Sequence, residues 1–273
     1  MKAGIDFGTT LVKVVWKHEN NYTFLSTAKQ PLEEIIKELK KEGIKQLNIV
    51  GIKSRNIHRI TGLADFELIA PKGDLITNEI ELQANGLKKL LELENIPTDK
   101  FLIVSIGTGT SYTFVDKFNI KRFPLGNSIG GGYIRGIGEL FGTKNYQEMV
   151  EHAVGGKILD YCIKDAIPEK EGTFEGELVI ANFGKADSKS KNKDIYASTI
   201  NCVVVSTIRD IMLIDMIPDF KVPDDIIYIG STLSNNQLLK ELLIKYSQMI
   251  GKKPEFPFYG EYALAIGAYH HND

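Results

Sequence analysis

This chain has few of the residues that build disulfide frameworks or metal sites. Its 273 residues include two cysteines, Cys162 and Cys202, which lie far apart and in no metal-binding spacing. We therefore expect two buried thiols in a reducing compartment. The chain also lacks an excess of charge of either sign, because its formal net charge is only −2. That balance gives no electrostatic basis for binding nucleic acid, so no nucleic-acid partner is expected.

Long hydrophobic runs are missing as well. No uninterrupted apolar stretch is long enough to cross a bilayer, and the first residues show neither the charged nor the apolar region of a signal peptide. A hydrophobic fraction of 43% and a charged fraction of 25% are ordinary for a globular protein. These features predict a cytoplasmic protein with no membrane partner.

Two turns rich in glycine and hydroxyl groups are the most informative features present. Gly8-Thr9-Thr10 follows the apolar run 2–7, and Gly107-Thr108-Gly109-Thr110-Ser111 follows the apolar run 101–106. Glycine lets backbone N–H groups approach an anion, and consecutive amides form an anion-binding nest. Asp6 precedes the first turn, where it can hold Mg²⁺ through water. A single turn of this kind is common in hairpins, but two in corresponding positions predict a nucleotide site.

The pattern of apolar runs and turn residues repeats once along the chain. The first part predicts strands over 3–7, 11–16 and 22–25, a helix between Pro31 and Gly43, and a strand over 47–52. The order restarts with strands over 101–106, 111–115 and 120–123, followed by a glycine-rich helix start at 130–132. This duplicated βββαβ plan predicts an α/β, two-lobed fold of the actin-like ATPase (ribonuclease H-like) type. We place the N-terminal lobe at 1–72 and the larger C-terminal lobe at 73–273.

Five motifs occur in the order in which a known family carries them. They are Gly4-Ile5-Asp6 with Gly8-Thr9 and Lys13, Val104 with 107–111, Gly126 with 130–132, Ala181-Asn182-Phe183-Gly184, and Tyr228-Ile229-Gly230-Ser231. From Gly4 to Ala268 the chain resembles the type II pantothenate kinases, the eukaryotic-like form also found in staphylococci and some bacilli. The resemblance implies an ATP- and Mg²⁺-dependent homodimer that makes 4′-phosphopantothenate, the first step of coenzyme A biosynthesis. It also implies a possible acyl-CoA regulator.

The resemblance assigns the catalytic base to Glu79, in the segment Asn78-Glu79-Ile80-Glu81. We expect Glu79 in the first turn of a helix, where the helix dipole would keep the carboxylate ionised and ready to accept a proton. Glu81 is the competing candidate two residues on, on a different helix face. Read without the family, Glu79 is an ordinary acid near a helix start.

The resemblance also assigns the binding residues. Arg122, Thr108 and Ser111 correspond to substrate positions, and a guanidinium suits the carboxylate of pantothenate. The nucleotide and its metal would be bound by Asp6, Gly8, Thr9, Thr10, Lys13, Gly107, Thr108, Gly109, Gly130, Gly131, Gly132, Gly230 and Ser231. Simpler alternatives remain: Arg122 and Lys13 as solvated strand residues, and the three glycines as a site of close helix packing rather than of bare N–H groups for phosphate.

Some residues depart from the family pattern. Phe123-Pro124-Leu125 is one residue longer than the usual spacing after Arg122, and Leu264 replaces a small residue. Two other functions therefore stay open: a kinase of another small hydroxyl compound such as an amino sugar, and a non-catalytic ATP- or acyl-CoA-binding sensor. An activating ATPase with an iron–sulfur cluster is disfavoured, since two distant cysteines cannot supply four thiolates from one short segment. The polar run 185–193 is expected to be a solvated loop.

Overall fold

The structure is a computed structural model that describes residues 1–19, 21–51 and 62–271. Its contacts divide the chain into two compact units. The first consists of Met1–Asp99, Val115–Arg122 and Phe256–Asp273, and the second of Lys100–Phe114 and Phe123–Glu255. The strands form two five-stranded sheets with corresponding order. One sheet lies in the first unit, and the other lies in the second unit apart from its edge strand at Ile120–Arg122, which groups with the first.

The sheet of the first unit has the order β3-β2-β1-β4-β5. Strands β1 and β2 and strands β2 and β3 pair antiparallel, whereas β4 pairs parallel with both β1 and β5. The strands are β1 (Lys2–Phe7), β2 (Val12–His18), β3 (Asn21–Ser26), β4 (Gln46–Val50) and β5 (Glu67–Ile69). The predicted strands are present, although β2 starts later and runs further than expected. Ile52, predicted to end β4, lies outside the described residues.

The second sheet has the order β12-β11-β6-β7-β8. Its strands are β6 (Phe101–Ile106), β7 (Thr110–Val115), β8 (Ile120–Arg122), β11 (Asp225–Ile229) and β12 (Lys253–Glu255). The central β6 thus corresponds to β1, and β11 pairs parallel with β6 as β4 does with β1. The predicted duplication is confirmed. A separate pair, β9 (Tyr161–Cys162) and β10 (Val179–Ala181), lies within the long connection between β8 and β11.

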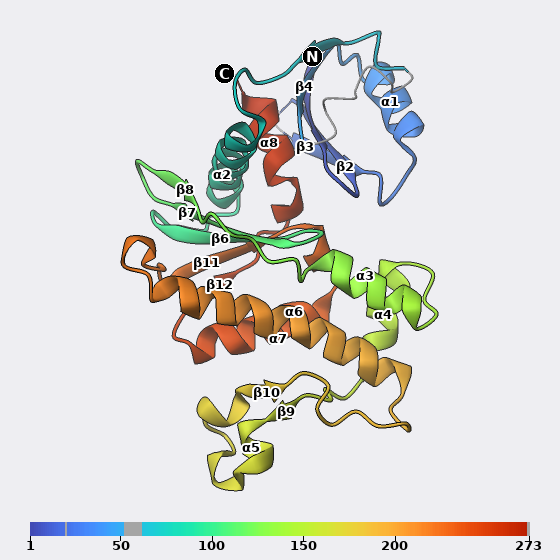
Figure 1. Cartoon of the computed structure of the whole chain (residues 1–273). Helices are drawn as coiled ribbons and strands as arrows, with labels where there is room; N and C mark the ends of the chain where they lie inside the picture. The colour runs from blue at the N-terminus through green and yellow to red at the C-terminus, as the bar shows by residue number, and fades with distance from the viewer. Residues whose placement is uncertain (20, 52–61, 272–273) are drawn as a thin grey trace. The chain divides into compact units, whose positions relative to one another are not determined.

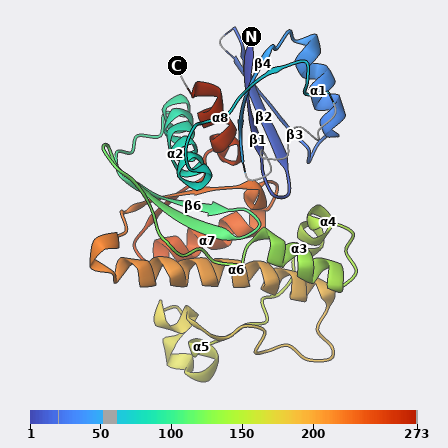
Figure 2. The same ribbon diagram turned by 45° about the horizontal axis from the view of Figure 1, so that its top comes forward.

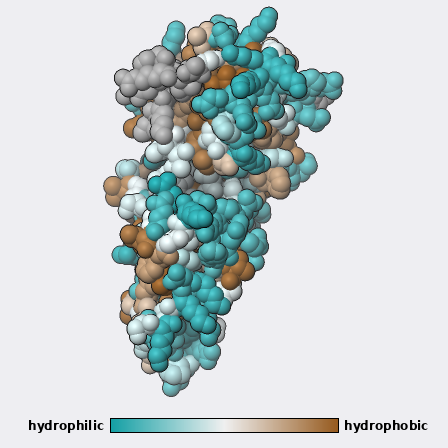
Figure 3. Space-filling view, turned by 90° about the vertical axis from the view of Figure 1, so that its right-hand side faces the viewer, coloured by the Kyte–Doolittle hydropathy of each residue, from teal (hydrophilic) through white to brown (hydrophobic). Residues whose placement is uncertain are grey.

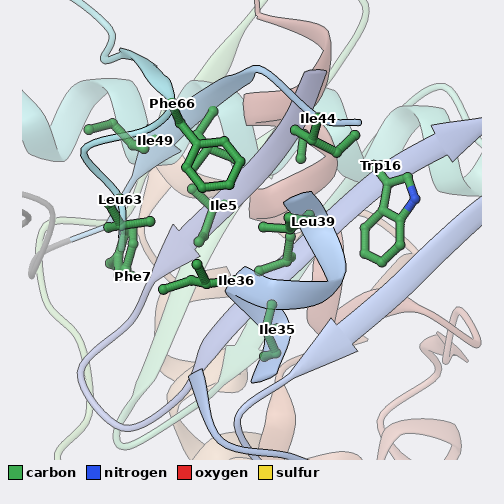
Figure 4. Close-up of a cluster of buried hydrophobic side chains, with 13 residues drawn as sticks. Ile5, Phe7, Trp16, Ile35, Ile36, Leu39, Ile44, Ile49, Leu63 and Phe66 are labelled. Atoms are coloured by element: carbon green, nitrogen blue, oxygen red, sulfur yellow. The ribbon is translucent and has the colours of Figure 1, made fainter. Parts of the chain in front are cut away.

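Strand β1 sends alternate side chains to two differently covered faces. Ile5 and Phe7 point into an apolar cluster with Trp16 and with Ile35 and Leu39 of helix α1 (Leu32–Lys41), shown in Figure 4. Gly4 and Asp6 point to the opposite face, which helix α8 (Ala263–His270) covers (Figure 1). A β-carbon on Gly4 would lie 2.1 Å from the Ala265 carbonyl oxygen, so glycine is what lets this helix rest on the strand.

Helix α2 (Leu75–Leu93) packs directly against α8. A β-carbon on Gly86 would lie 1.9 Å from the carbonyl oxygen of Ala263, and one on Gly267 would lie 1.9 Å from that of Leu82. This backbone-to-backbone contact explains why α2 groups with the first unit, whereas the lobe boundary that we placed between 72 and 73 assigned it to the second. The side chain of Leu264 is partly buried and packs against a small cluster formed by Val50, Leu82 and Ala268.

Helices α6 (Asn192–Asp215) and α7 (Gln237–Met249) run side by side along the sheet of the second unit (Figure 2). Helix α6 has the length and apolar composition of a membrane span, but most of it is buried in the structure, as in the core helix of a globular domain. It begins at Asn192, inside the run that we expected to be loop. The other helices are α3 (Gly131–Leu140), α4 (Tyr146–Ala153) and α5 (Ile163–Ala166), with 3₁₀ turns at Pro168–Lys170, Glu175–Glu177, Pro218–Phe220, Ser231–Leu233 and Gly260–Tyr262.

The visible surface is mixed in character. On the face in Figure 3, hydrophilic residues predominate and apolar residues lie in small separate groups. Among the exposed large apolar side chains are Met212, Leu213 and Met216, near the C-terminal end of α6. Single exposed apolar residues are normal in folded proteins, so the grouping at one helix end is the feature of interest.

Candidate active site

Asp6 is the only acidic residue on β1, and its side chain lies beneath the surface. The residue is 5% exposed, and its Oδ2 accepts a hydrogen bond from Nζ of Lys13 at 3.3 Å. The two residues are directly paired across β1 and β2, which places their side chains on the same face. Burial raises the pKa of the Asp6 carboxyl, and the Lys13 ammonium lowers it in part. Lys13 is therefore a buried partner of Asp6 and not a solvated strand lysine.

A glycine that sequence analysis missed holds the Asp6 carboxylate from the other side. Gly51 directly follows β4, with a φ of +103°. A β-carbon there would lie 2.6 Å from the Phe7 carbonyl oxygen and 2.8 Å from Oδ1 of Asp6. Only glycine combines this φ with this close approach. The signal was a glycine directly after a buried strand, next to the strand that carries Asp6.

The first predicted phosphate turn lies immediately beyond this carboxylate. Gly8 is partly exposed, and Thr9 and Thr10 are exposed. Thr27 supports the far side of the turn, since its Oγ1 accepts a hydrogen bond from the Val12 N–H at 2.9 Å. The turn thus presents hydroxyl and backbone groups at the surface beside a buried acid–base pair.

Glu79 lies on α2, but not where we expected it. The helix begins at Leu75 behind the N-cap Asp74, which accepts a hydrogen bond from the Thr77 N–H at 2.8 Å, so Glu79 is beyond the first turn. The prediction that the helix dipole keeps this group ionised is wrong. Its pKa is raised, mainly by burial and then by the negative charge of Asp6, and the positive charge of Arg122 opposes this rise. Glu81 is exposed, which separates the two candidate bases.

Arg122 is the last residue of β8. The segment Val115–Arg122 belongs to the first unit, and β8 contacts α2. Lys88 of α2 donates from Nζ to the Asp116 carbonyl oxygen at 3.1 Å, at the turn of the hairpin. In the segment after Arg122, which is one residue longer than the family spacing, Leu125 is 71% exposed. Arg122 is exposed, and its positive charge lowers the pKa of Glu79.

Glu79, Asp6 and Arg122 all belong to the first unit. Their side chains are of the types suited to accepting a proton, holding a metal ion and binding an anion. A carboxylate with a raised pKa is a better proton acceptor near neutral pH than an ordinary glutamate. Asp6 fits Mg²⁺, which is commonly bound by one or two carboxylates together with water and phosphate oxygens. Over the described parts of the chain, no group of three or more His, Cys, Asp or Glu side chains could hold a metal. An ion at Asp6 would therefore draw most of its ligands from water and substrate.

Backbone hydrogen bonds join the second phosphate turn, in the second unit, to the start of α3. The Gly107 N–H donates to the Gly109 carbonyl at 2.9 Å, which closes the turn. The Gly131 and Gly132 N–H groups donate to the carbonyls of Gly107 and Thr108, at 2.7 and 2.9 Å. Our phosphate prediction required these two N–H groups to be free, but both already donate to backbone carbonyls. In this structure the triple glycine builds the turn.

The Gly230–Ser231 segment closes on the same turn. Gly230 has a φ of +115°, and a β-carbon there would lie 2.3 Å from the Ile106 carbonyl oxygen. It follows β11 as Gly51 follows β4, so these two corresponding strands end in the same way. Thr232, which sequence analysis missed, donates from Oγ1 to the Gly107 carbonyl at 2.9 Å. Of the predicted substrate hydroxyls, Thr108 is exposed and Ser111 partly exposed.

Known proteins resemble this chain in sequence over nearly its whole length. A family model described as Fumble matches residues 81–271. A Type II pantothenate kinase of Staphylococcus epidermidis is 30% identical over 98% of this chain and 99% of its own length. Another, from Staphylococcus saprophyticus, is 30% identical over 99% of this chain and 100% of its own.

The solved structures confirm the predicted α/β fold class. The activator of 2-hydroxyisocaproyl-CoA dehydratase from Clostridium difficile with bound ADPNP superimposes with a TM-score of 0.63. The match covers 98% of this chain and 92% of that chain, at 15% sequence identity. At this identity the likeness shows the actin-like fold alone.

Proposed function

Because this chain belongs to the Fumble family, the type II pantothenate kinases, we propose that it is an ATP-dependent pantothenate kinase. The γ-phosphoryl group of ATP passes to the primary hydroxyl of pantothenate, giving ADP and 4′-phosphopantothenate for coenzyme A biosynthesis. The observation that carries the proposal is the place of Glu79 on α2, in the first unit with Asp6 and Arg122. Burial and then the charge of Asp6 raise the pKa of its carboxyl, and the charge of Arg122 lowers it. A base, a metal-binding acid and an anion-binding cation are the groups that this transfer requires.

Glu79 accepts the proton of the attacking hydroxyl. The hydroxyl oxygen forms a bond to the γ-phosphorus as the bond from that phosphorus to the bridging oxygen breaks, and the proton passes to the carboxylate. The raised pKa of Glu79 favours this transfer, because it makes the carboxylate a stronger base. Partial burial also keeps the carboxylate from being fully solvated by water.

Asp6 would hold Mg²⁺ when the nucleotide is bound, and the ion would supply positive charge that neutralises the phosphates. Lys13, now paired with Asp6, is close enough to share that task. The turn Gly8 to Thr10 and the turn Gly107 to Gly109 each present backbone N–H groups and hydroxyls that bind phosphate oxygens. The triple glycine contributes by shaping the second turn, and Gly230 and Ser231 contact the adenosine.

Arg122 binds the carboxylate of pantothenate, and Thr108 and Ser111 bind its polar groups. We further propose that the protein is a cytoplasmic homodimer and that an acyl-CoA is a candidate regulator. The exposed apolar residues Met212 and Leu213 on α6 and Met216 directly after it are a candidate part of the dimer surface. Sedimentation at several protein concentrations tests the dimer separately from activity.

Product identification tests the proposed function. Purified protein is incubated with ATP and Mg²⁺ and with pantothenate or an amino sugar, and the products are identified by mass spectrometry. We expect 4′-phosphopantothenate and no sugar phosphate. Sugar phosphorylation without pantothenate phosphorylation would move the assignment to the alternative kinase, and nucleotide binding without turnover of either substrate would indicate the sensor.

A further inference from the structure

We propose that Asp210 and Asn127 are positioning residues that hold the second phosphate turn in its binding shape. Both lie in the second unit, Asn127 between the glycines of the motif Gly126 to Gly132 and Asp210 outside the motifs considered above. The inference deepens the proposed function and rests on its assignment of residues 107–111 to nucleotide binding. It concerns how the turn is held, since neither side chain needs to touch the nucleotide.

Asn127 lies in the loop that covers the turn. Its backbone N–H and carbonyl both pair with Thr110, each at 2.8 Å, which forms an isolated bridge to the start of β7. The Thr110 side chain donates to the Ile129 carbonyl at 3.0 Å. The covering is tight, because a β-carbon on Gly109 would lie 2.7 Å from the Asn127 carbonyl oxygen. The position of this loop therefore fixes the position of the turn beneath it.

The Asn127 side chain uses both ends of its amide. Oδ1 accepts from the Ile129 N–H at 2.8 Å, and Nδ2 donates to Oγ of Ser206 at 2.6 Å and to Oδ2 of Asp210 at 2.7 Å. The backbone donor to Oδ1 and the carboxylate acceptor of Nδ2 settle which way the amide points. An aspartate at position 127 would place its carboxylate next to that of Asp210, and the two negative charges would repel each other.

Asp210 connects this loop to the rest of the second unit. It belongs to α6, the long helix against the sheet, and its Oδ2 also accepts from the Tyr112 hydroxyl of β7 at 2.6 Å. Burial and then this hydrogen bond raise the pKa of Tyr112, so its hydroxyl stays a donor. One carboxylate oxygen thus joins β7, the covering loop and α6. Hydrogen bonds to a charged group are stronger than neutral ones, which makes Asp210 the strongest fixed point for the loop.

The loop continues from Asn127 into the glycines that contact the turn. Two residues after Ile129, the Gly131 N–H donates to the Gly107 carbonyl, and the next N–H donates to the carbonyl of Thr108. A shift of Asn127 would therefore be passed along a short segment to both ends of the turn. Backbone N–H groups bind phosphate only while they keep their arrangement, so the predicted consequence is weaker nucleotide binding.

The test compares nucleotide affinity in Asn127→Asp, Asp210→Asn and the double variant, with Asp224→Asn as a matched control on an exposed residue. Titration calorimetry with a non-hydrolysable ATP analogue gives Kd without turnover. Asn127→Asp should raise Kd by more than about tenfold, since it replaces a hydrogen bond to a charged group by repulsion. Asp210→Asn should raise it by about fivefold, because the amide oxygen still accepts but without charge.

The double variant provides the decisive comparison, because it exchanges the amide and the carboxylate between the two positions. The amide nitrogen introduced on α6, in the place of Asp210 Oδ2, carries two hydrogens. It can donate one to the carboxylate introduced in the loop and the other to the Tyr112 hydroxyl oxygen, while that carboxylate still accepts from the Ile129 N–H. Kd should therefore return to within about threefold of wild type. Wild-type affinity in Asn127→Asp, or a double variant no better than Asn127→Asp, would overturn the inference. If Asn127→Asp does not fold, as circular dichroism would report, unchanged affinity in Asp210→Asn is the contradicting result.

The same titration separates this inference from the proposed function. Wild-type protein that binds the analogue but does not phosphorylate pantothenate would show that the substrate is wrong, and the variants would still test the turn. Wild-type protein that fails to bind the analogue would overturn the inference along with the nucleotide site.

Discussion

The contact between α2 and α8 should control both stability and catalysis. Gly86→Ala would place a methyl carbon 1.9 Å from the Ala263 carbonyl oxygen. An ordinary contact needs roughly 3.5 Å, so the helices must separate by about 1 Å or more. Overpacking of this kind costs about 1–3 kcal/mol of unfolding free energy. Because α2 carries Glu79, the same displacement should lower kcat by about a hundredfold, the usual effect of misplacing a catalytic group by about 1 Å.

Thermal unfolding and kcat are measured on the same preparations. Gly136→Ala is the matched control, since a β-carbon there meets no atom within 4 Å and the residue lies inside α3. That variant should be as stable as wild type or more so, by up to about 1 kcal/mol. Gly86→Ala with wild-type melting temperature and wild-type kcat would refute the argument that backbone contact places Glu79.

Three further predictions concern the first unit. Arg122→Gln should move the acidic limb of the kcat–pH profile to higher pH, because Arg122 lowers the raised pKa of Glu79 and the base must be deprotonated; an unmoved limb would contradict the coupling. Lys13→Met should raise the Mg²⁺ concentration needed for half-maximal rate, because loss of the ammonium lets the Asp6 pKa rise further and favours its protonated form; unchanged Mg²⁺ dependence over pH would argue against Asp6 as the ligand. Asn48→Ala should lower the unfolding free energy by about 1–3 kcal/mol, since the buried amide donates to the Ala268 carbonyl in the last turn of α8 at 2.8 Å; an unchanged denaturant midpoint would be the opposing result.

Much of the framework followed from local patterns. Apolar runs bounded by glycine and polar turns predicted the strands around both phosphate turns, because each buried strand must end where the chain reaches solvent. The duplication followed from the order of these runs. Asp6 could be named because it precedes the first turn in sequence, and Lys13 because it matches a lysine of the family that the chain resembles.

What the sequence left open depends on contacts between distant residues. Gly51 and Thr232 contact the ends of β1 and β6 from segments far along the chain, and no local pattern encodes that proximity. The environment of Glu79 was predicted wrongly for the same reason. Its local position suggested a helix dipole effect, whereas burial and the charge of Asp6, brought near by tertiary packing, determine its pKa. For the triple glycine we likewise predicted phosphate binding by free N–H groups. Two of these groups donate to the carbonyls of Gly107 and Thr108, which lie more than twenty residues earlier in the chain.

The central claim is that Glu79 is the base of a pantothenate kinase. The most direct measurement is pantothenate-dependent ADP formation in wild type, Glu79→Gln and Glu81→Gln, with phosphopantothenate identified as the product. Glu79→Gln should lose at least about a hundredfold in kcat, the scale expected for a general base. Glu81→Gln should keep wild-type activity, because Glu81 is exposed. Wild-type turnover by Glu79→Gln, or loss of turnover in Glu81→Gln alone, would contradict the account.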